Sequence, residues 1–444
     1  MRDLLARAAE LAADHRAGLD DRPVAKPVDP AALRAAFGQL RDAPTPPATV
    51  LEELAKAAEP GLVATAGPRF FGFVIGGALP AATAADVLAA GWDQNAFNAV
   101  LSPAAAAAEQ AAGDWLKELL GLPATASAGF VTGGQAANTV GLAAARHHVL
   151  AEAGWDVERD GLAGAPRVRV VASEERHATV DRALRLLGFG TRAVVPVKAK
   201  ADGAIDIDDL AAKVDGPTIV CLQAGNVNTG ACDDMRAARA VAENAWIHVD
   251  GAFGLWAAAN PRTASLLDGV ELADSWACDG HKWLNVPYDS GFVFCARPDV
   301  HAETIAYRAA YLTGAGEVSG MGDLTLESSR RARGFAVWAA LRELGRDGVA
   351  ELVDRCCRLA HRFARTLAEG GAEIANDVVL NQVLVSFGDN TDTIIDRVQR
   401  DGTCWLGGTT WRGRRYLRIS VSNWTTTEAD VDRSAAAILR LAAQ

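Results

Sequence analysis

The chain has 444 residues, of which 50% are hydrophobic and 6% aromatic, and its formal net charge is -11. This length suffices for a large core and for two or three domains, and the composition is typical of a soluble, helix-rich globular protein rather than a disordered one. The acidic balance argues against a nucleic-acid partner, because a basic patch supplies most of the affinity for nucleic acids.

The N-terminal region is expected to form a helical arm. Residues 1–14 place their apolar side chains on one face of a helix, and proline-rich connectors follow at 23–30 and around 44–47. Arms of this kind often pack on a partner subunit. We therefore interpret residues 1–60 as an N-terminal arm and expect the protein to be an oligomer.

The chain carries no sign of export, membrane insertion or metal binding. Asp3, Glu10 and Asp14 lie within the first helical turns, so there is no uninterrupted apolar core of a signal peptide. No stretch approaches the roughly 20 apolar residues of a membrane span. The seven cysteines have no metal-ligand spacing, and their odd number favours reduced thiols. We expect a cytoplasmic protein without a membrane partner or a metal.

From about residue 100 the pattern becomes that of an α/β domain, to which we assign residues 61–325. Ser102 and Pro103 are typical of a helix start, and that helix would run to Leu120. Short apolar runs then alternate with helical segments, which predicts a mostly parallel sheet of the seven-stranded type. The runs cover 167–172, 193–197, 218–222, 246–249, 275–278 and 291–295. Ligands of such sheets bind beyond the carboxyl ends of the strands.

The C-terminal part, residues 326–444, is expected to contain a long linking helix and a smaller α+β domain. The long helix would span about 327–344 and end near Gly345. The elements predicted after it are a helix at 349–370, apolar runs at 378–387 and 416–421, and a last helix from Glu428.

A glycine-rich segment at 129–139 leads into an alanine-rich helix. Gly133 and Gly134 would let backbone N–H groups approach a phosphate, and the helix N-terminus adds partial positive charge. The segment lacks the Lys-Ser/Thr pair of a P-loop, which argues against a nucleoside triphosphate. An ordinary glycine turn before a helix explains the same pattern equally well.

Two polar side chains follow apolar runs of the predicted sheet. Asp250 comes directly after the run 246–249, where a carboxylate can pair with a pyridinium nitrogen and keep it protonated. Lys282 follows the run 275–278 closely and has His281 beside it; a partly desolvated lysine there is a candidate Schiff-base nucleophile. Taken singly, the aspartate could simply begin a turn and the lysine could simply end a strand at the surface.

A histidine occupies the corresponding position after the run 167–172. His177 could stack on a flat ring or transfer protons, although a lone histidine is usually a solvated loop residue. His147 and His148 provide a contrast, because they lie within a helix and have no such motif. We interpret those two as structural.

Together these features resemble the group II PLP-dependent decarboxylases, the family of aromatic-amino-acid and glutamate decarboxylases. The resemblance runs from about residue 50 to the end of the chain. The central matching residues are Thr132, Gly133, Gly134, His177, Gly225, Asn226, Asn228, Thr229, Gly230, Asp233, His248, Asp250, Ala252, His281, Lys282 and Trp283. Further matches lie upstream at 70–71 and 101–103 and downstream at Arg330, Arg331 and Trp338.

The resemblance implies PLP fold type I, an aspartate-aminotransferase-like fold, and a homodimer with active sites at the subunit interface. It implies that Lys282 binds pyridoxal 5′-phosphate (PLP) as a Schiff base and that Asp250 pairs with the pyridine nitrogen. His177 would stack on one face of the ring and Ala252 on the other. The remaining implied cofactor-binding residues are Gly133, Gly134, Gln135 and His281 around the phosphate and Asn226 and Asn228 near the ring.

The implied reaction is decarboxylation of an L-amino acid to the amine and CO2, through an external aldimine and a quinonoid. Relatives carry a catalytic tyrosine in a mobile loop, but the corresponding stretch here, 313–325, contains none. Either another group such as His177 supplies the proton, or the protein is an aldehyde synthase or a carbon–carbon lyase; an aminotransferase is a weaker alternative. A non-catalytic scaffold is disfavoured, because it need keep neither Lys282 nor Asp250.

The resemblance also places four residues near the substrate: Phe73, Gly76, Asn95 and Phe97. Arg418 is a fifth candidate, because it lies at the start of a predicted C-terminal strand. Asn95 stands where aromatic decarboxylases have an apolar residue, which suggests a more polar or differently shaped substrate side chain. Arg418 could bind a substrate carboxylate through a bidentate contact, and a structural ion pair is an equal alternative.

Overall fold

The computed structural model describes residues 1–306 and 320–444. The chain forms two compact units. The first unit comprises residues 1–77, 359–375 and 383–444, and the second comprises 78–358 and 376–382. The three-part division predicted at residues 60 and 325 stays a prediction.

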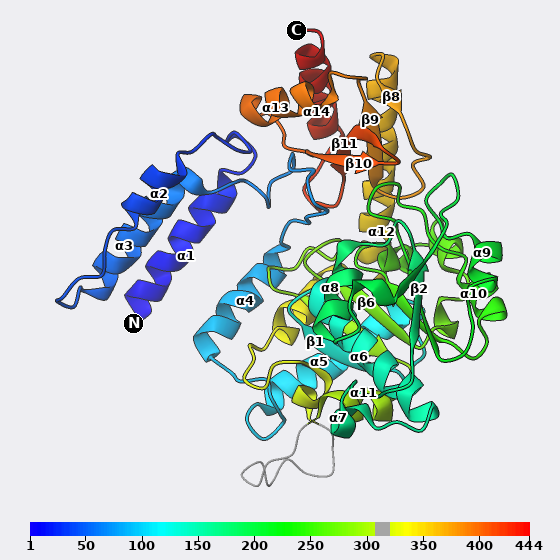
Figure 1. The fold of residues 1–444 in the computed structure, drawn as a ribbon. Coiled ribbons are helices and arrows are strands. Elements are labelled where there is room, and N and C mark those ends of the chain that lie inside the picture. Colours follow the sequence, from blue (N-terminus) through cyan, green and yellow to red (C-terminus); the bar gives the residue numbers. More distant parts are fainter. Residues whose placement is uncertain (307–319) are drawn as a thin grey trace. The chain divides into compact units, whose positions relative to one another are not determined.

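The second unit is built on a seven-stranded sheet with the order β1-β7-β6-β5-β4-β2-β3 (Figure 1). The strands from β6 to β3 are parallel, whereas β7 is antiparallel to both of its neighbours, β6 and β1. All strands except β7 therefore end at the same edge of the sheet. Their bounds are β1 Ser127–Val131, β2 Arg169–Ser173, β3 Val194–Val197, β4 Thr218–Gln223, β5 Trp246–Asp250, β6 Ser275–Asp279 and β7 Gly291–Cys295.

The six apolar runs found in the sequence correspond to β2 through β7 and differ from them by at most two residues at either end. The first strand, β1, was not predicted. It lies at the end of the sheet, pairs with β7 alone, and has Phe130 and Val131 as its only large apolar side chains. A short edge strand of this kind has little local signal, so pairing with β7 decides its conformation.

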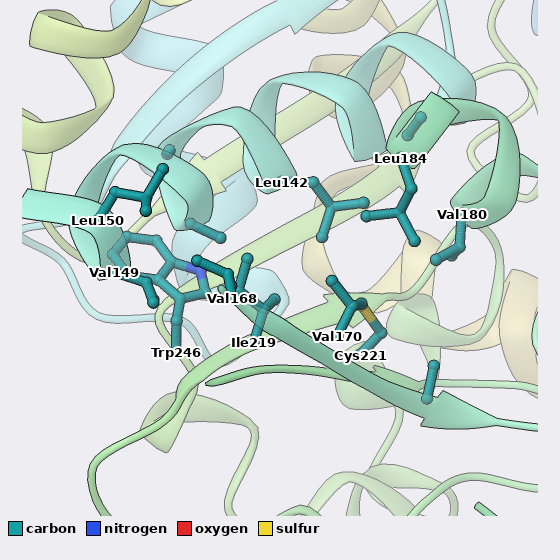
Figure 2. Packing of buried hydrophobic residues seen from close by; sticks show 14 of the residues in the cluster. Leu142, Val149, Leu150, Val168, Val170, Val180, Leu184, Ile219, Cys221 and Trp246 are labelled. Atoms are coloured by element: carbon teal, nitrogen blue, oxygen red, sulfur yellow. The ribbon is translucent and has the colours of Figure 1, made fainter. Parts of the chain in front are cut away.

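A cluster of buried apolar side chains holds helices α6 (Gly134–Glu152) and α8 (Ala178–Leu186) against the sheet (Figure 2). Leu142 and Leu184 from the helices pack with Ile219 of β4, and none of the three is exposed. Burying one Leu or Ile side chain contributes about 1.5–3 kcal/mol. The cluster therefore holds the second half of α6 against the sheet, and the glycine-rich segment lies where this helix begins.

The remaining helices of this unit connect the strands or cover the sheet. They are α4 Pro80–Trp92, α5 Pro103–Leu119, α7 Val157–Asp160, α9 Ile207–Ala211, α10 Met235–Val241 and α11 Pro298–Ile305, and short 3-10 turns occur at Thr191–Ala193, Gly254–Ala259, Ala264–Leu267, Val270–Leu272 and Met321–Leu324. Ser102 caps α5 by accepting a hydrogen bond from the Ala105 N–H, as predicted.

The long helix α12 spans Gly334–Glu369 and changes direction at Gly345, which has a φ of 61°. The predicted break near Gly345 is confirmed, but the predicted start at residue 327 is wrong. Arg330 instead turns inward and donates to both carboxylate oxygens of Glu109, at 3.0 and 2.6 Å. A Cβ on Gly334 would lie 2.5 Å from Glu109 Cγ, so the helix begins at a residue without a side chain.

The first unit begins with three helices, α1 (Arg2–Ala17), α2 (Pro30–Ala36) and α3 (Pro47–Ala58), drawn in blue in Figure 1. Helices α2 and α3 were not predicted, because their prolines were interpreted as connectors. Proline is favoured at the first position of a helix, where its missing N–H is not needed, and both helices start in this way. Arg7 of α1 pairs with Glu52 of α3 at 2.6 Å.

The rest of the first unit contains a four-stranded sheet with the order β10-β11-β9-β8. Its elements are β8 Glu373–Ile374, β9 Gln382–Ser386, α13 Thr391–Asp401, β10 Gly407–Trp411, β11 Arg414–Ser420 and α14 Glu428–Ala442. The predicted runs 378–387 and 416–421 overlap β9 and β11, whereas β8 and β10 were missed. Among the described residues, none of the helices has both the length and the apolar character that a membrane span requires.

Candidate active site

Four predicted site residues lie at the carboxyl edge of the seven-stranded sheet. Lys282 follows β6, Asp250 ends β5, Asn226 follows β4 and His177 follows β2. The three strands β4, β5 and β6 are direct neighbours, and Asp250 is paired in register with a residue on each side. The α/β topology thus brings these side chains to one edge, as ligand sites of such sheets require.

A buried aspartate that was not among the predicted site residues connects the lysine to the glycine-rich segment. Asp279 Oδ2 lies 3.1 Å from Lys282 Nζ, and Asp279 Oδ1 accepts a hydrogen bond of 2.5 Å from the Gly134 N–H. His281 Nε2 lies 3.5 Å from the same oxygen. The signal for Asp279 was present in the sequence, since a carboxylate three residues before the lysine ends the same buried strand.

The glycines of this segment are required by close packing. A Cβ on Gly133 would lie 2.9 Å from His281 Cε1, and one on Gly134 would lie 2.9 Å from Asp279 Oδ2. A Cβ on Gly291 of β7 would lie 2.5 Å from the Gly133 backbone. The positive end of α6 therefore faces Asp279 directly. Because Asp279 accepts the Gly134 N–H, the role of Gly134 as a phosphate ligand stays a prediction.

Asp250 is 6% exposed at the end of β5. Its Oδ1 accepts a hydrogen bond of 3.3 Å from the Ala252 N–H, and the Ala252 carbonyl accepts one of 3.0 Å from the Asp279 N–H. Ala252 thus ties the two aspartates to each other. Placing a carboxylate in such a site is costly unless a cation or strong donor meets it, and a protonated pyridine nitrogen would fit that need.

His177 caps the N-terminus of α8 and is exposed. Its Nδ1 accepts a hydrogen bond of 3.3 Å from the Thr179 N–H and lies 2.8 Å from Thr179 Oγ1. Gln135 also reaches this turn, since its Nε2 donates to the Thr179 carbonyl at 3.2 Å. The starts of α6 and α8 are thereby held together beside the imidazole ring.

His281 is half-buried, and its Nδ1 accepts a hydrogen bond of 3.2 Å from the Ser290 N–H. Burial lowers the pKa of His281 below its usual value, although Asp279 opposes this effect. The neutral ring then carries its proton on Nε2, the nitrogen that faces Asp279.

Asn226 and Asn228 belong to one tight loop after β4. Asn226 is 1% exposed, and its Oδ1 accepts hydrogen bonds from the N–H groups of Asn228 and Thr229, at 2.9 and 3.2 Å. Its Nδ2 donates to Glu175 Oε2 at 3.3 Å. These contacts account for Asn226 as the residue that shapes the loop, and a cofactor contact by either asparagine stays a prediction.

The predicted substrate residues divide between the two units. Asn95 and Phe97 belong to the second unit, where Asn95 Oδ1 accepts hydrogen bonds from the N–H groups of Phe97 and Arg330, at 3.1 and 3.2 Å. The Phe97 ring packs on Gly322, where a Cβ would lie 2.3 Å from it. Asn95 thus shapes the chain locally, whatever contact it makes with a substrate.

Phe73, Gly76 and Arg418 belong to the first unit, and their role towards the substrate stays a prediction. Phe73 is 64% exposed and has its ring centroid 5.3 Å from that of Trp405. Burial lowers the pKa of Arg418 to about 10. Most of the tyrosine-free stretch 313–325, together with Tyr307 and Tyr311, lies outside the described residues.

The donor set at the sheet edge fits a flat ring that bears an aldehyde and a phosphate. Lys282 offers an amine, Asp250 a buried carboxylate and His177 an imidazole, and the glycine-rich start of α6 offers backbone N–H groups. Within 1–306 and 320–444, no three His, Cys, Asp or Glu side chains are grouped so that they could hold a metal ion.

Comparison with known proteins identifies relatives along nearly the whole chain. Residues 30–388 match the pyridoxal-dependent decarboxylase conserved domain. Tryptophan decarboxylase 1 of Oryza sativa subsp. japonica is 29% identical over 95% of this chain and 90% of its own length. The 4-hydroxyphenylacetaldehyde synthase of Rhodiola rosea is 26% identical over 93% of this chain and 89% of its own.

A solved structure shares the fold. The crystal structure of Oryza sativa TDC with PLP and tryptamine superposes with a TM-score of 0.93 at 25% identity, covering 100% of this chain and 97% of that one. This likeness confirms the predicted α/β architecture of PLP fold type I.

Proposed function

Because the chain belongs to the family of pyridoxal-dependent decarboxylases, we propose that it removes the α-carboxylate of an L-amino acid and releases the amine and CO2. Membership makes it a PLP-dependent enzyme of the carboxy-lyase class. The observation that carries the proposal is the grouping of Lys282, Asp279 and Asp250 beside the start of α6 at one sheet edge.

The residues of this chain would divide the work as follows. Lys282 Nζ would hold the cofactor covalently, and Asp279 Oδ2 lies 3.1 Å from that nitrogen. Asp250 would keep the pyridine nitrogen protonated, and His177 would lie against the ring. When bound, PLP accepts the electron pair that the breaking Cα bond leaves behind. Which bond breaks depends on how the protein orients the substrate.

Oxidative deamination is the second candidate, and the absence of tyrosine from 313–325 favours it. A relative 26% identical to this chain is a 4-hydroxyphenylacetaldehyde synthase. In that reaction the amino acid, O2 and water give the aldehyde, CO2, ammonia and H2O2. The two outcomes therefore differ in their need for oxygen and in whether the nitrogen leaves as amine or as ammonia.

The test is a product analysis. The PLP-loaded protein is incubated with each proteinogenic L-amino acid, with and without O2, and the products are identified by mass spectrometry. One amine per CO2, formed equally well without oxygen, supports decarboxylation and identifies the substrate. Aldehyde with equimolar ammonia and H2O2, formed only with oxygen, supports the alternative, and the Lys282→Ala protein serves as the inactive control.

We also propose that the enzyme is a homodimer to which the N-terminal helices contribute. Helices α1 and α3 expose apolar side chains, with Leu5, Val50 and Leu54 at 53%, 49% and 54% exposure. Exposed apolar side chains grouped on one arm favour a partner surface. Sedimentation velocity should give twice the 46.5 kDa mass of the chain, and a monomer at micromolar concentration would contradict the proposal.

A further inference from the structure

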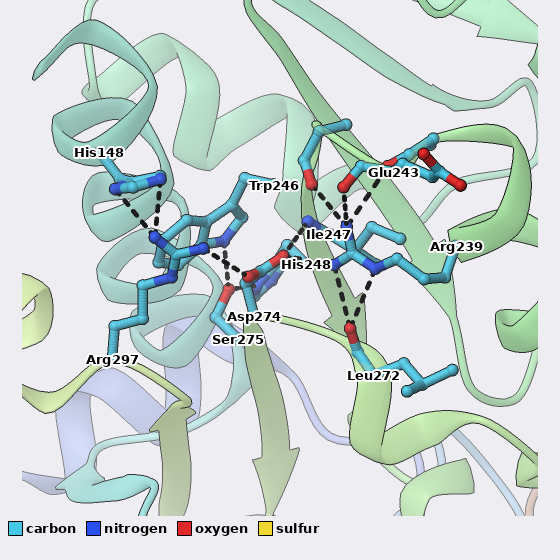
Figure 3. Close-up of polar contacts among 12 residues, drawn as sticks. His148, Arg239, Glu243, Trp246, Ile247, His248, Leu272, Asp274, Ser275 and Arg297 are labelled. Atoms are coloured by element: carbon cyan, nitrogen blue, oxygen red, sulfur yellow. Dashed lines mark hydrogen bonds and ion pairs between the residues drawn. The ribbon is translucent and has the colours of Figure 1, made fainter. Parts of the chain in front are cut away.

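A series of hydrogen bonds begins in the core, at the amino ends of β5 and β6 (Figure 3). The Trp246 indole N–H donates to Ser275 Oγ at 2.9 Å, and Ser275 Oγ lies 2.8 Å from His248 Nδ1. His248 Nε2 lies 2.9 Å from Asn138 Oδ1. Strands β5 and β6 carry Trp246, His248 and Ser275, and helix α6 carries Asn138. This series of hydrogen bonds therefore crosses from the sheet to the helix.

The same series continues from α6 to the turn that holds His177. Asn138 Nδ2 donates to Thr179 Oγ1 at 3.1 Å, and Thr179 Oγ1 lies 2.8 Å from His177 Nδ1. Five hydrogen bonds therefore connect the indole in the core to the imidazole at the sheet edge. We call the side chains of Ser275, His248, Asn138 and Thr179 the relay.

The partners of the relay determine its direction. An indole N–H can only donate, so Ser275 Oγ accepts from Trp246. Asn138 Oδ1 can only accept, so the single hydrogen of the neutral His248 ring is on Nε2, and His248 Nδ1 accepts the hydrogen of the Ser275 hydroxyl. His248 then donates through Nε2 to Asn138. At the other end the Thr179 backbone N–H donates to His177 Nδ1, so that nitrogen must accept. If every hydrogen bond of the relay ran in the opposite direction, His177 Nδ1 would carry a hydrogen that points at the Thr179 N–H.

Burial makes the links among Ser275, His248 and Asn138 costly to break. Asn138 is 1% exposed, and His248 and Ser275 are not exposed at all. A buried polar group without its partner costs about 1–3 kcal/mol. Burial also lowers the pKa of His248 to about 3, so the ring is neutral and has a single N–H to give.

A glycine in the middle of α6 makes room for the relay. A Cβ on Gly141 would lie 2.6 Å from His248 Cε1 and 2.8 Å from His248 Nδ1. Glycine inside a helix costs about 0.5–1 kcal/mol relative to alanine, so its presence here needs a reason. The close approach of the imidazole ring supplies it.

We propose that Ser275, His248 and Asn138 are positioning residues that act through Thr179 to hold His177 as the tautomer protonated on Nε2. His177 then presents an N–H donor on the side of its ring that points away from Thr179. The consequence for catalysis rests on the function proposed above, because His177 matters there only if it lies against the cofactor.

The test reads the tautomer of His177 by NMR. The PLP-loaded protein is labelled with 15N-histidine, and long-range 1H–15N correlation spectra separate Nδ1-protonated from Nε2-protonated rings among its eight histidines. A His177→Gln protein assigns the His177 signals. We expect the wild-type ring to be protonated on Nε2, and a ring protonated on Nδ1 would overturn the proposal.

Variants separate the relay from local packing. In Asn138→Asp the carboxylate accepts from both neighbours, the Thr179 hydroxyl turns towards it, and His177 is expected to shift towards the Nδ1-protonated form. Asn260→Asp is the matched control, since Asn260 is also a buried amide (4% exposed) but lies outside the relay and donates to the Ala350 carbonyl. An unchanged His177 tautomer in Asn138→Asp would overturn the relay.

A second pair of variants applies if Asn138→Asp does not fold. Thr179 lies at the half-buried start of α8, where Thr179→Val removes the last hydroxyl and Thr179→Ser keeps it. We expect Val to raise the Nδ1-protonated fraction and Ser to leave it at the wild-type level. Equal spectra for the two proteins would overturn the proposal.

The NMR result and the proposed function can fail independently. If the wild-type protein forms no amine but the variants shift the His177 tautomer as expected, the decarboxylase proposal is refuted and the relay proposal is not. If the wild-type protein forms amine but the tautomer of His177 is the same in wild type and variants, only the relay proposal is refuted. In an active enzyme, we expect Asn138→Asp to lower kcat about tenfold and Asn260→Asp to leave it unchanged.

Discussion

The two sheets of this protein use opposite charges in different ways. At the carboxyl edge of the seven-stranded sheet, Lys282 pairs with an aspartate that is 2% exposed. In the four-stranded sheet, Arg414 pairs with Glu373 at 2.8 Å, but their side chains are 55% and 51% exposed. The distances are similar, 3.1 and 2.8 Å, so distance does not distinguish the two pairs.

Burial distinguishes them. Removing a charge from water costs several kcal/mol, and a protein retains such a charge only where good partners or a function offset that cost. An exposed pair costs little and contributes little, with a median of about 0–1 kcal/mol. The buried ion pairs of this chain therefore indicate positions that contribute to the active site or to the stability of the fold.

The largest effect is expected at Lys282, the partner of the buried Asp279. Lys282→Ala should lower kcat by about a thousandfold or more, because the group that would hold the cofactor covalently is lost. Borohydride reduction followed by mass spectrometry should then find no cofactor attached to the chain. Lys213→Ala, which removes a partly exposed lysine paired with Asp209, should keep both activity and attachment.

The buried pair between Glu109 and Arg330 should dominate stability. Glu109→Leu leaves Arg330, whose side chain is fully buried, without its carboxylate and should lower the free energy of unfolding by about 3–5 kcal/mol. Urea denaturation followed by circular dichroism measures the change. A loss below about 1 kcal/mol would mean that this pair behaves like a surface pair and would contradict the distinction drawn from burial.

Buried neutral groups should make the stability depend on pH. The pKa of His248 falls from 6.5 to about 3 on burial, so below pH 6.5 the unfolded chain takes up a proton that the folded chain refuses. Because of this histidine, the free energy of unfolding decreases as the pH is lowered from 6 to 3, by up to about 1.4 kcal/mol per pH unit. His248→Asn should reduce the slope by about one proton, and an unchanged slope would contradict the burial of the ring.

The smallest effect is expected at the exposed pair. Arg414→Ala should change the free energy of unfolding by less than about 1 kcal/mol and leave kcat unchanged, because water replaces the guanidinium around Glu373. The urea experiment that serves for Glu109→Leu measures both variants side by side. A loss of several kcal/mol would show that exposure does not separate the two kinds of pair.

Local patterns in the sequence were enough to predict the framework of the site. Strands β2 to β7 each show a short apolar run, and Asp250, Lys282 and His177 each follow one of them. Parallel strands end at one edge of the sheet, so the order of these motifs alone predicts that the three side chains lie at the same edge. The missing tyrosine, too, is visible in the sequence.

The tertiary structure decided the contacts between distant segments. Asp279 meets Gly134 across 145 positions of the chain, Glu109 meets Arg330 across 221, and His248 meets Asn138 across 110. The spacing of apolar residues in the sequence does not predict such a pairing, because each partner resembles any other polar residue in its local segment. Folding brings the partners together, and the cost of burying them unpaired then selects which side chains must meet.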